Sequence, residues 1–206
     1  MPQTYGPTLR FETPDFIVRS AVLGDETEAW GGWLEDPRRA AMLNAVPRRR
    51  TLEELRTYIS GFDRIDRHLF GLFLKDTGRI IGIRTVEIDR ARRAYTVHML
   101  VGDSADWGRG AADQSTGVLV DWAYEVRDLL WIEGTVLAQN RKMIRYLVDS
   151  GWSITGDGKT PSAAFDGRLI DMVLLKRHRD VWRKDPRSSV LRGVPALTGL
   201  ESSAGG

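Results

Sequence analysis

Three apolar segments separated by short polar turns occupy the middle of this 206-residue chain. They run over residues 69–75, 79–89 and 94–101, and they are joined by Asp76-Thr77-Gly78 and by the four residues 90–93. Each segment is rich in residues that favour strands, and connections of this kind join neighbouring strands as hairpins. The region therefore predicts an antiparallel meander of three strands, which commits the chain to a fold that contains a sheet.

One strand and two helices are expected ahead of this meander. Residues 16–19, Phe-Ile-Val-Arg, are typical of a short strand. Trp30 and Trp33 follow, and their spacing places both indoles on one face of a helix. Thr51 and Glu54 have the spacing of a capping box, and the apolar residues behind them recur at helical spacing. These signals predict two helices between the first strand and the meander.

The elements after the meander alternate between helix and strand. We expect a loop over 103–110, a helix from Ala112 to near Asp128, a strand over 130–137, a helix that ends at Gly151, and closing strands over 152–154 and 169–175. This order predicts an α/β fold with a mixed, mostly antiparallel sheet flanked by helices. From Pro186 the composition shifts to Ser, Gly, Pro and Ala, which is typical of a mobile tail.

Charge and composition limit the classes of function. Lys and Arg number 30 against 28 Asp and Glu, and a net charge of +2 gives no support for a nucleic-acid partner. The chain has no Cys, which excludes disulfides, thiol catalysis and Cys-ligated zinc, and we expect no metal. No apolar run approaches the ~20 residues of a membrane helix, and the N-terminal segment does not have the pattern of a signal peptide. We therefore expect a cytoplasmic protein without a membrane partner.

The segment from Trp107 to Ala112, where the expected loop meets a helix, carries the most specific chemistry. Gly108 and Gly110 let the backbone approach a ligand, and the free N–H groups at a helix start bind anions, for which a pyrophosphate is a natural guest. No Lys or Ser follows as in a nucleoside triphosphatase, and Asp113 stands where a dinucleotide fingerprint requires Gly or Ala. A helix start made permissive by two glycines, with no ligand, is the alternative interpretation.

This segment resembles the pyrophosphate loop of the GNAT N-acetyltransferase superfamily, whose pattern is Gln or Arg, two residues, Gly, one residue, then Gly or Ala. Gly110 and Ala112 match, whereas Trp107 departs from the first position, as in the RimJ/RimL-like branch that acetylates ribosomal-protein N-termini. Residues 16–20, 78–82 and 140–152 are similar to the family's first strand, central hairpin and second cofactor helix. The resemblance implies a GNAT-type fold with an N-terminal extension over 1–15, an acyl-CoA N-acyltransferase domain over 16–185 and a C-terminal tail over 186–206.

The resemblance also implies which residues hold the cofactor, acetyl-CoA or another acyl-CoA. In similar enzymes the strand before the loop splays from the next strand, and its exposed backbone binds the pantetheine arm. The residues so assigned are Leu100, Val101 and Gly102 on the strand, Trp107, Gly108, Arg109, Gly110, Ala111 and Ala112 in the loop, and Asn140. Met143 stands where the family usually has Ser. Leu147 replaces a Tyr that protonates the departing thiolate in some members, and the adjacent Tyr146 should point elsewhere on its helix.

The reaction implied is direct attack of an amine on the thioester carbonyl, which requires a base to accept the amine proton. His98, Glu87 and Glu133 are the candidate bases on the expected strands, and we favour Glu87 or His98. Each has a structural interpretation as well: His98 as a hydrogen-bonded core residue, Glu87 as a surface residue and Glu133 as a structural residue.

The acceptor remains open among a small-molecule amine, an amino sugar and a protein N-terminus. Trp30, Trp33 and residues 48–50, three consecutive arginines, belong to the region that lines the acceptor side in this family, and an Arg-lined site would favour an acidic substrate. The alternative from another class is a domain that binds acyl-CoA or a partner as a scaffold without efficient catalysis. Formation of a homodimer is likewise left open by the sequence.

Overall fold

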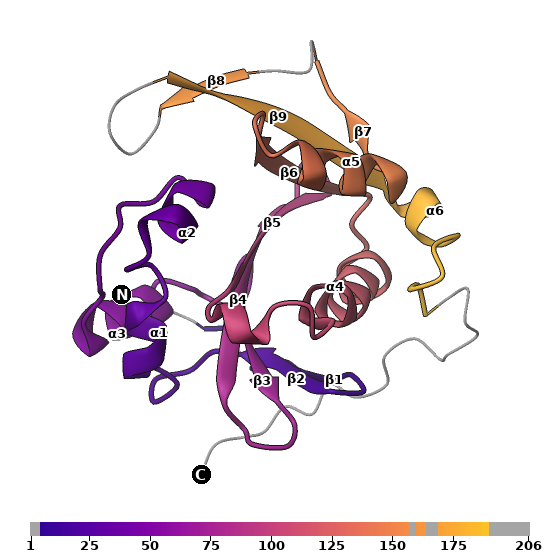
Figure 1. Ribbon diagram of the computed structural model, residues 1–206. Helices are drawn as coiled ribbons and strands as arrows, with labels where there is room; N and C mark the ends of the chain where they lie inside the picture. The colour runs from indigo at the N-terminus through magenta and orange to yellow at the C-terminus, as the bar shows by residue number, and fades with distance from the viewer. Residues whose placement is uncertain (1–4, 157–159, 164–168, 190–206) are drawn as a thin grey trace.

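The computed structural model describes residues 5–156, 160–163 and 169–189, and within these ranges nine strands form one sheet (Figure 1). The strand order is β1-β2-β3-β4-β5-β6-β9-β7, and β8 pairs with β9 beside this path. The strands are β1 Arg10–Glu12, β2 Phe16–Ser20, β3 Arg67–Leu74, β4 Ile80–Asp89, β5 Ala94–Val101, β6 Trp131–Leu137, β7 Ser153–Ile154, β8 Thr160–Ala163 and β9 Leu169–His178.

The sheet is mixed but mostly antiparallel, so the predicted fold class is confirmed. The meander β3-β4-β5 pairs antiparallel, and the parallel pair is β5 with β6. This parallel pairing extends over three residue pairs, from Ala94↔Trp131 to Thr96↔Glu133. Beyond these pairs the ladder stops, although β5 continues to Val101 and β6 to Leu137. The sheet therefore opens between the C-terminal halves of two neighbouring strands.

Two groups of helices stand on either side of this opening. The helices are α1 Glu28–Gly32, α2 Pro37–Met42, α3 Leu52–Ser60, α4 Ala111–Asp121, α5 Arg141–Asp149 and α6 Arg179–Trp182. Figure 1 shows α1, α2 and α3 together on one side, with α4, α5 and α6 on the other. The capping box predicted from Thr51 and Glu54 is formed at the start of α3, with both reciprocal hydrogen bonds present.

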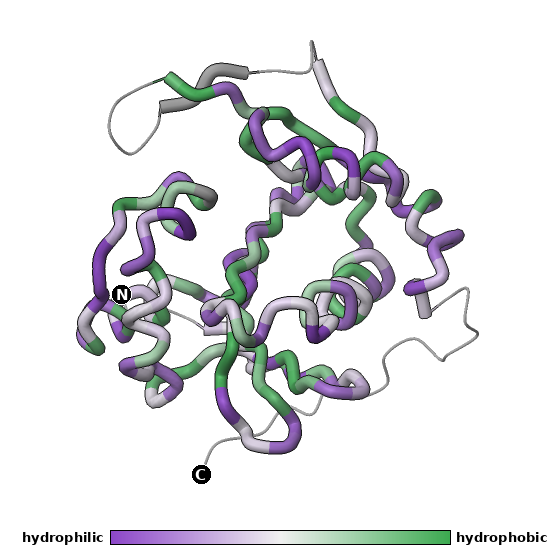
Figure 2. The backbone as a smooth tube through the Cα atoms, viewed as in Figure 1, coloured by the Kyte–Doolittle hydropathy of each residue, from purple (hydrophilic) through white to green (hydrophobic). Residues whose placement is uncertain are grey.

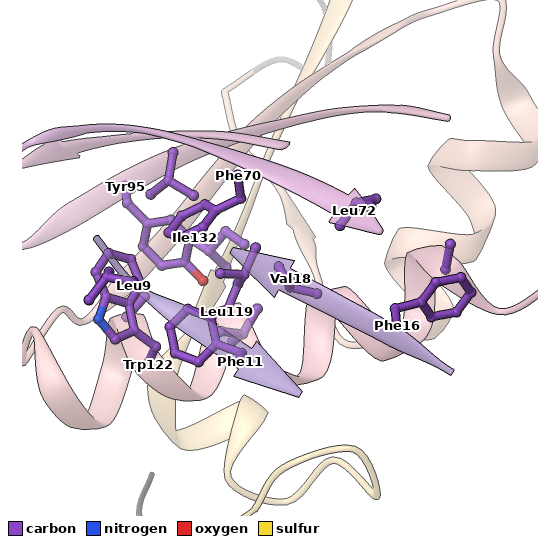
Figure 3. Close-up of a cluster of buried hydrophobic side chains, with 14 of the residues drawn as sticks. Leu9, Phe11, Phe16, Val18, Phe70, Leu72, Tyr95, Leu119, Trp122 and Ile132 are labelled. Carbon is purple, nitrogen blue, oxygen red and sulfur yellow. The ribbon is translucent and has the colours of Figure 1, made fainter. Parts of the chain in front are cut away.

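Each face of the sheet has its own apolar core. The core beneath α4 contains Phe11, Phe70 and Trp122, whose rings contact one another edge-on or tilted (Figure 3). The core on the other face contains Trp30, Trp33, Leu55 and Ile59 from α1, α3 and the adjoining loop. Figure 2 shows hydrophobic residues concentrated along the central strands and within α4, while α5 is largely hydrophilic. The two cores fix the strands that border the opening from both faces.

Some elements were not predicted because they are too short to show a period. β1 has three residues, and only Phe11 of these is buried. β8 and α6 have four residues each.

The helix expected to run from Ala112 to near Asp128 begins at Ala111 and ends at Asp121, where one π-helical turn, Trp122–Val126, continues it.

The C-terminal segment begins as a packed structure. Ser188 and Ser189 are buried, and the backbone N–H of Ser189 donates to the Asp121 carboxylate at 2.9 Å. The tail predicted from Pro186 onward is thus anchored over residues 186–189, and its remainder lies outside the described residues. No helix in the described part of the chain is long and apolar enough to cross a membrane.

Candidate cofactor cleft and acceptor pocket

The opening between β5 and β6 is a cleft of about 630 Å³. Its walls come from the two strands that diverge, from α4 and α5, and from α2 with the residues that follow it. Residues that line it include Val97, Met99, Val101, Val136, Asn140, Tyr146 and Leu147. The splayed strands expected from the family resemblance are therefore present, and they enclose a cavity large enough for a ligand.

The glycine-rich segment forms the start of α4 at the edge of this cleft. Gly108 and Gly110 have φ values of +76° and +81°, a backbone conformation that L side chains rarely adopt. Gly110 is the N-cap residue, and no side chain caps the helix. The N–H groups of the first turn, which have no partner within the helix, are therefore available to an anion.

A buried carboxylate holds the loop that precedes α4. Asp106 is 2% exposed and accepts two hydrogen bonds of 2.8 Å from the Arg79 guanidinium, which lowers the pKa of Asp106. Arg109 lies 3.5 Å from the same carboxylate and is itself exposed. The indole N–H of Trp107 donates to the Val101 carbonyl at 3.2 Å. Trp107 thus ties the loop to the end of β5, a role that its departure from the family pattern did not reveal.

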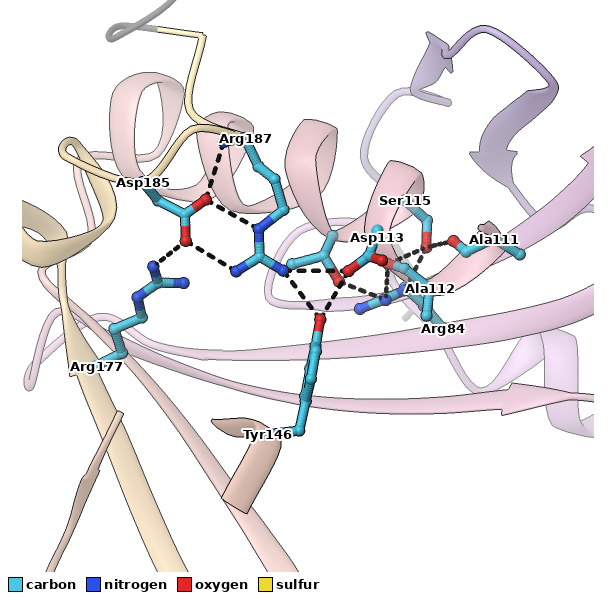
Figure 4. A network of polar contacts seen from close by, with 10 residues as sticks. Arg84, Ala111, Ala112, Asp113, Ser115, Tyr146, Arg177, Asp185 and Arg187 are labelled. Carbon is cyan, nitrogen blue, oxygen red and sulfur yellow. Dashed lines mark hydrogen bonds and ion pairs between the residues drawn. The ribbon is translucent and has the colours of Figure 1, made fainter. Parts of the chain in front are cut away.

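Arg84 places a buried cation under the first turns of α4. It points from β4 and donates to the Ala112 carbonyl, Ser115 Oγ and Thr116 Oγ1 at 2.6–2.8 Å, all uncharged acceptors (Figure 4). Burial lowers the pKa of Arg84 to about 10, so the guanidinium remains charged at neutral pH. No carboxylate of the described residues forms an ion pair with Arg84, which also lines the cleft. The cleft therefore has a positive charge without a partner beside the free N–H groups of α4.

A second polar network joins α4, α5 and the C-terminal segment (Figure 4). Tyr146 on α5 donates to the Asp113 carboxylate at 2.6 Å, and Arg187 contacts both Asp113 and Tyr146 at 3.0–3.2 Å. The Arg187 side chain also donates two hydrogen bonds to Asp185, which pairs in turn with Arg177. Burial alone would raise the pKa of Asp185, but the hydrogen bonds from the two arginines outweigh it and lower that pKa. The network offsets the negative charge of Asp113, which otherwise would oppose an anion at the start of α4.

Along the end of β5, the backbone N–H and C=O groups alternate between those that face β4 and those that face the cleft. The Gly102 N–H donates to the Ile81 carbonyl at 2.8 Å, and the Leu100 carbonyl lies on the Gly82 side, toward β4. Backbone groups alternate in direction along an antiparallel strand, so those of Met99 and Val101 face the cleft. Of the three strand residues expected to bind the pantetheine arm, Val101 alone presents its backbone to the cleft. The Gly102 N–H and the Leu100 carbonyl face the β4 ladder instead, so binding of the arm by the backbone of these two residues stays a prediction.

Residues on α5 occupy the opposite wall of the cleft. Asn140 is the N-cap of α5, and its side-chain oxygen accepts from the Met143 N–H at 3.2 Å. Leu147 lines the cleft as expected, but Tyr146 does as well, which contradicts the expectation that it points elsewhere. Burial, and then its hydrogen bond to Asp113, raises the pKa of Tyr146. A phenol already engaged in this way is a poor donor to a departing thiolate.

The three candidate bases lie in different surroundings. His98 is exposed on β5 and lines both the cleft and a second cavity of about 340 Å³ on the side of α1 and α3, so it is no core residue. Glu87 lines this second cavity, with its carboxylate 3.7 Å from the Arg67 guanidinium. Glu133 forms an ion pair of 2.6 Å with Arg92 and lines neither cavity. His98 and Glu87 thus line the same cavity, whereas Glu133 lies outside both cavities.

Comparison with known proteins agrees with this geometry. The sequence profile of the family described as "Acetyltransferase (GNAT) domain" matches residues 16–153, and the chain belongs to this family. None of the curated proteins matches the sequence.

Solved structures share the fold at low sequence identity. Spermidine N-acetyltransferase from Vibrio cholerae, solved with CoA and spermine, is 16% identical with a TM-score of 0.68, over 82% of this chain and 99% of the other. Ribosomal-protein-S5-alanine acetyltransferase from Vibrio fischeri is 20% identical with a TM-score of 0.68, over 84% and 98% of the two chains. A structure titled as a probable acetyltransferase is 16% identical with a TM-score of 0.71, over 84% and 98%. These likenesses show the fold alone.

Several residues of the site were not found from the sequence. Arg84 lies in an otherwise apolar run, Ile80 to Val86, and a lone arginine on a buried strand is the signal that could have revealed it. Arg187 and Asp185 could not have been found, because their contacts depend on where the chain returns after β9.

Proposed function

We propose that this chain is an acyl-CoA-dependent N-acyltransferase that transfers an acetyl group to a primary amine. The observation that carries the proposal is the cleft between β5 and β6. One end of it has the free N–H groups of α4 and the Arg84 cation, and His98 stands where it joins the second cavity. An anionic cofactor and an amine would enter from different cavities and meet at the same strand edge.

The residues present fit a pyrophosphate group. Gly108 and Gly110 keep side chains away from the N–H groups of the first turn, and Arg84 and Arg109 add positive charge. Met99 and the Val101 N–H offer open backbone groups to an extended arm in the cleft, the Val101 carbonyl being engaged by Trp107, while Asn140 and Tyr146 lie on the facing wall. When bound, acyl-CoA supplies the activated thioester.

The chemistry is a transfer of one acyl group with no redox change. The amine nitrogen attacks the thioester carbonyl carbon, a C–N bond forms, the C–S bond breaks, and the thiolate leaves with the bonding pair. The amine loses one proton to a base, and the thiolate gains one from solvent. His98 is placed to accept the amine proton directly or through one water. An N–H of the β5 edge would stabilise the charge that develops on the carbonyl oxygen.

A binding or scaffold module is the second candidate. Its support is specific: Leu147 stands where a thiolate-protonating Tyr would be, and the Tyr146 hydroxyl is engaged by Asp113 and Arg187. The RimJ/RimL-like assignment remains a resemblance, since the structural neighbours act on amines as different as spermidine and a ribosomal protein.

One assay separates the two candidates. Thiol release from acetyl-CoA is followed across a panel of primary amines, while the melting temperature is recorded with and without CoA. We expect CoA to raise the melting temperature, because it binds the native state alone, and at least one amine to release thiol. A CoA-dependent shift without thiol release from any amine would support the scaffold function instead.

A further inference from the structure

The second cavity has a wall of aromatic rings and a small set of charges. Trp30 and Trp33 stack with ring centroids 5.7 Å apart, and Tyr58 and Phe62 of α3 and its C-terminal loop contact each other edge-on. The cavity shares His98, Met99 and Leu100 with the cleft, so it opens onto the strand edge where an acyl group would lie. An acceptor in this cavity would place an apolar body against the rings and its amine toward β5.

The three consecutive arginines of the loop before α3 differ in their partners. Arg48 pairs with Glu54 at 2.7 Å, and Arg49 pairs with Glu28 and Glu35 at 2.9–3.0 Å. Arg50 lines the cavity, is half-buried, and has no ion pair with any carboxylate of the described residues. Its guanidinium lies over the Tyr58 ring at 5.4 Å. The loop thus directs into the cavity one cation that no carboxylate of the described residues neutralises.

The other charges of the cavity nearly cancel. Arg67 and Glu87 lie 3.7 Å apart on neighbouring strands, so their charges offset each other. Tyr58 is near all three charged groups. Burial raises the pKa of Tyr58, the positive charges of Arg50 and Arg67 lower that pKa, and the negative charge of Glu87 raises it. The net positive charge disfavours a polyamine and favours a group that a guanidinium binds well, a carboxylate.

We propose that the acceptor is a small primary amine that carries a carboxylate and an apolar body, as an amino acid does. Its carboxylate binds Arg50, its apolar part packs against Trp30 and Trp33, and its amine lies at the β5 edge beside His98. This assignment rests on the proposed acyl transfer, but it concerns a binding preference that can be measured without turnover.

The test compares phenylalanine, phenylalaninamide and spermidine with the CoA-saturated protein. Calorimetry gives the Kd of each compound, and thiol release gives its kcat/KM. The kcat/KM is expressed per unprotonated amine, because the ammonium group of the amide is more acidic and a larger fraction of the amide is unprotonated at a given pH. We expect phenylalanine to bind and react about 10- to 100-fold better than its amide, the factor of one charge-assisted contact. Tighter binding of spermidine or of the amide would overturn the proposal. Selective binding of phenylalanine with no thiol release would uphold the binding preference but overturn phenylalanine as an acceptor, and the panel of amines would then decide whether acyl transfer itself fails.

A matched pair of variants assigns the preference to one side chain. Arg50→Gln should bring the phenylalanine-to-amide ratio close to one, through KM more than kcat, and Arg50→Lys should restore part of it. Arg48→Gln removes an equal charge two residues away, from an exposed arginine outside the cavity. We expect Arg48→Gln to retain the ratio. Equal losses in the two Gln variants would show that overall charge, rather than an Arg50 contact, sets the preference.

Discussion

His98 is the one titratable side chain among the described residues that lines both cavities. If it accepts the amine proton, His98→Ala should lower kcat by about 10²- to 10⁴-fold without changing the Kd of CoA. The kcat of Glu87→Gln provides the comparison, because Glu87 lines the second cavity and not the cleft, and the charge of Arg67 offsets that of Glu87. Near wild-type turnover in the His98 variant would mean that the amine proton leaves to water and that the site works by positioning its substrates.

Another histidine should make the stability of the fold depend on pH. His68 is 1% exposed between Phe70 and Trp122, and burial lowers its pKa to about 4. The unfolded chain takes up a proton as the pH falls below about 6.5, whereas the native state does so only near 4. The free energy of unfolding should therefore decrease by up to about 3 kcal/mol between these values.

Urea unfolding at pH 7, 5.5 and 4 measures this dependence. His68→Phe keeps an aromatic ring at this position and removes the titrating imidazole. The free energy of unfolding of the variant should therefore change less between pH 7 and 4 than that of the wild type. The assignment would be wrong if wild type and variant lost stability in parallel across this interval.

At the scale of elements, the segment after β9 closes the structure against α4 and α5. A chain that ends at Pro186 loses the Arg187 contacts with Asp185 and Asp113 and the Ser189 contact with Asp121. Arg187 is only partly buried and Asp185 keeps its pair with Arg177, so the loss costs about 1–3 kcal/mol, the value of hydrogen bonds to charged groups. We expect this chain to melt about 3–10 °C below one that ends at Ser189. Equal melting temperatures would show that these contacts contribute little.

The elements also show what a sequence can predict and what it cannot. The meander, α3 and α4 have a clear period, a capping box or a glycine-rich start, and each forms about where the sequence indicated. The direction of the Leu100 and Gly102 backbone depends on the register with β4, which periodicity does not determine. Arg50 has no carboxylate partner among the described residues because Arg48 and Arg49, its neighbours in the loop, pair with the nearby carboxylates. Such properties arise from tertiary contacts and had no local signal.

For the molecule as a whole, the site depends on how the sheet opens. β5 and β6 pair over three residues and then separate, while each keeps its other neighbour, β4 or β9. The two strands are therefore held apart without losing the sheet on either side. This geometry places the start of α4, the β5 edge and the aromatic cavity in one continuous path.

CoA binding to Gly110→Val tests the central claim most directly, by calorimetry on the folded protein. A Val side chain at φ +81° would stand among the N–H groups that we propose bind the pyrophosphate, so we expect the Kd to rise about 100-fold or more. Gly24→Val is the control, since Gly24 has a φ of +102°, open space around it and no part in the cleft. The account predicts wild-type affinity in the control and lost affinity in Gly110→Val. Unchanged CoA affinity in a folded Gly110→Val protein would contradict it.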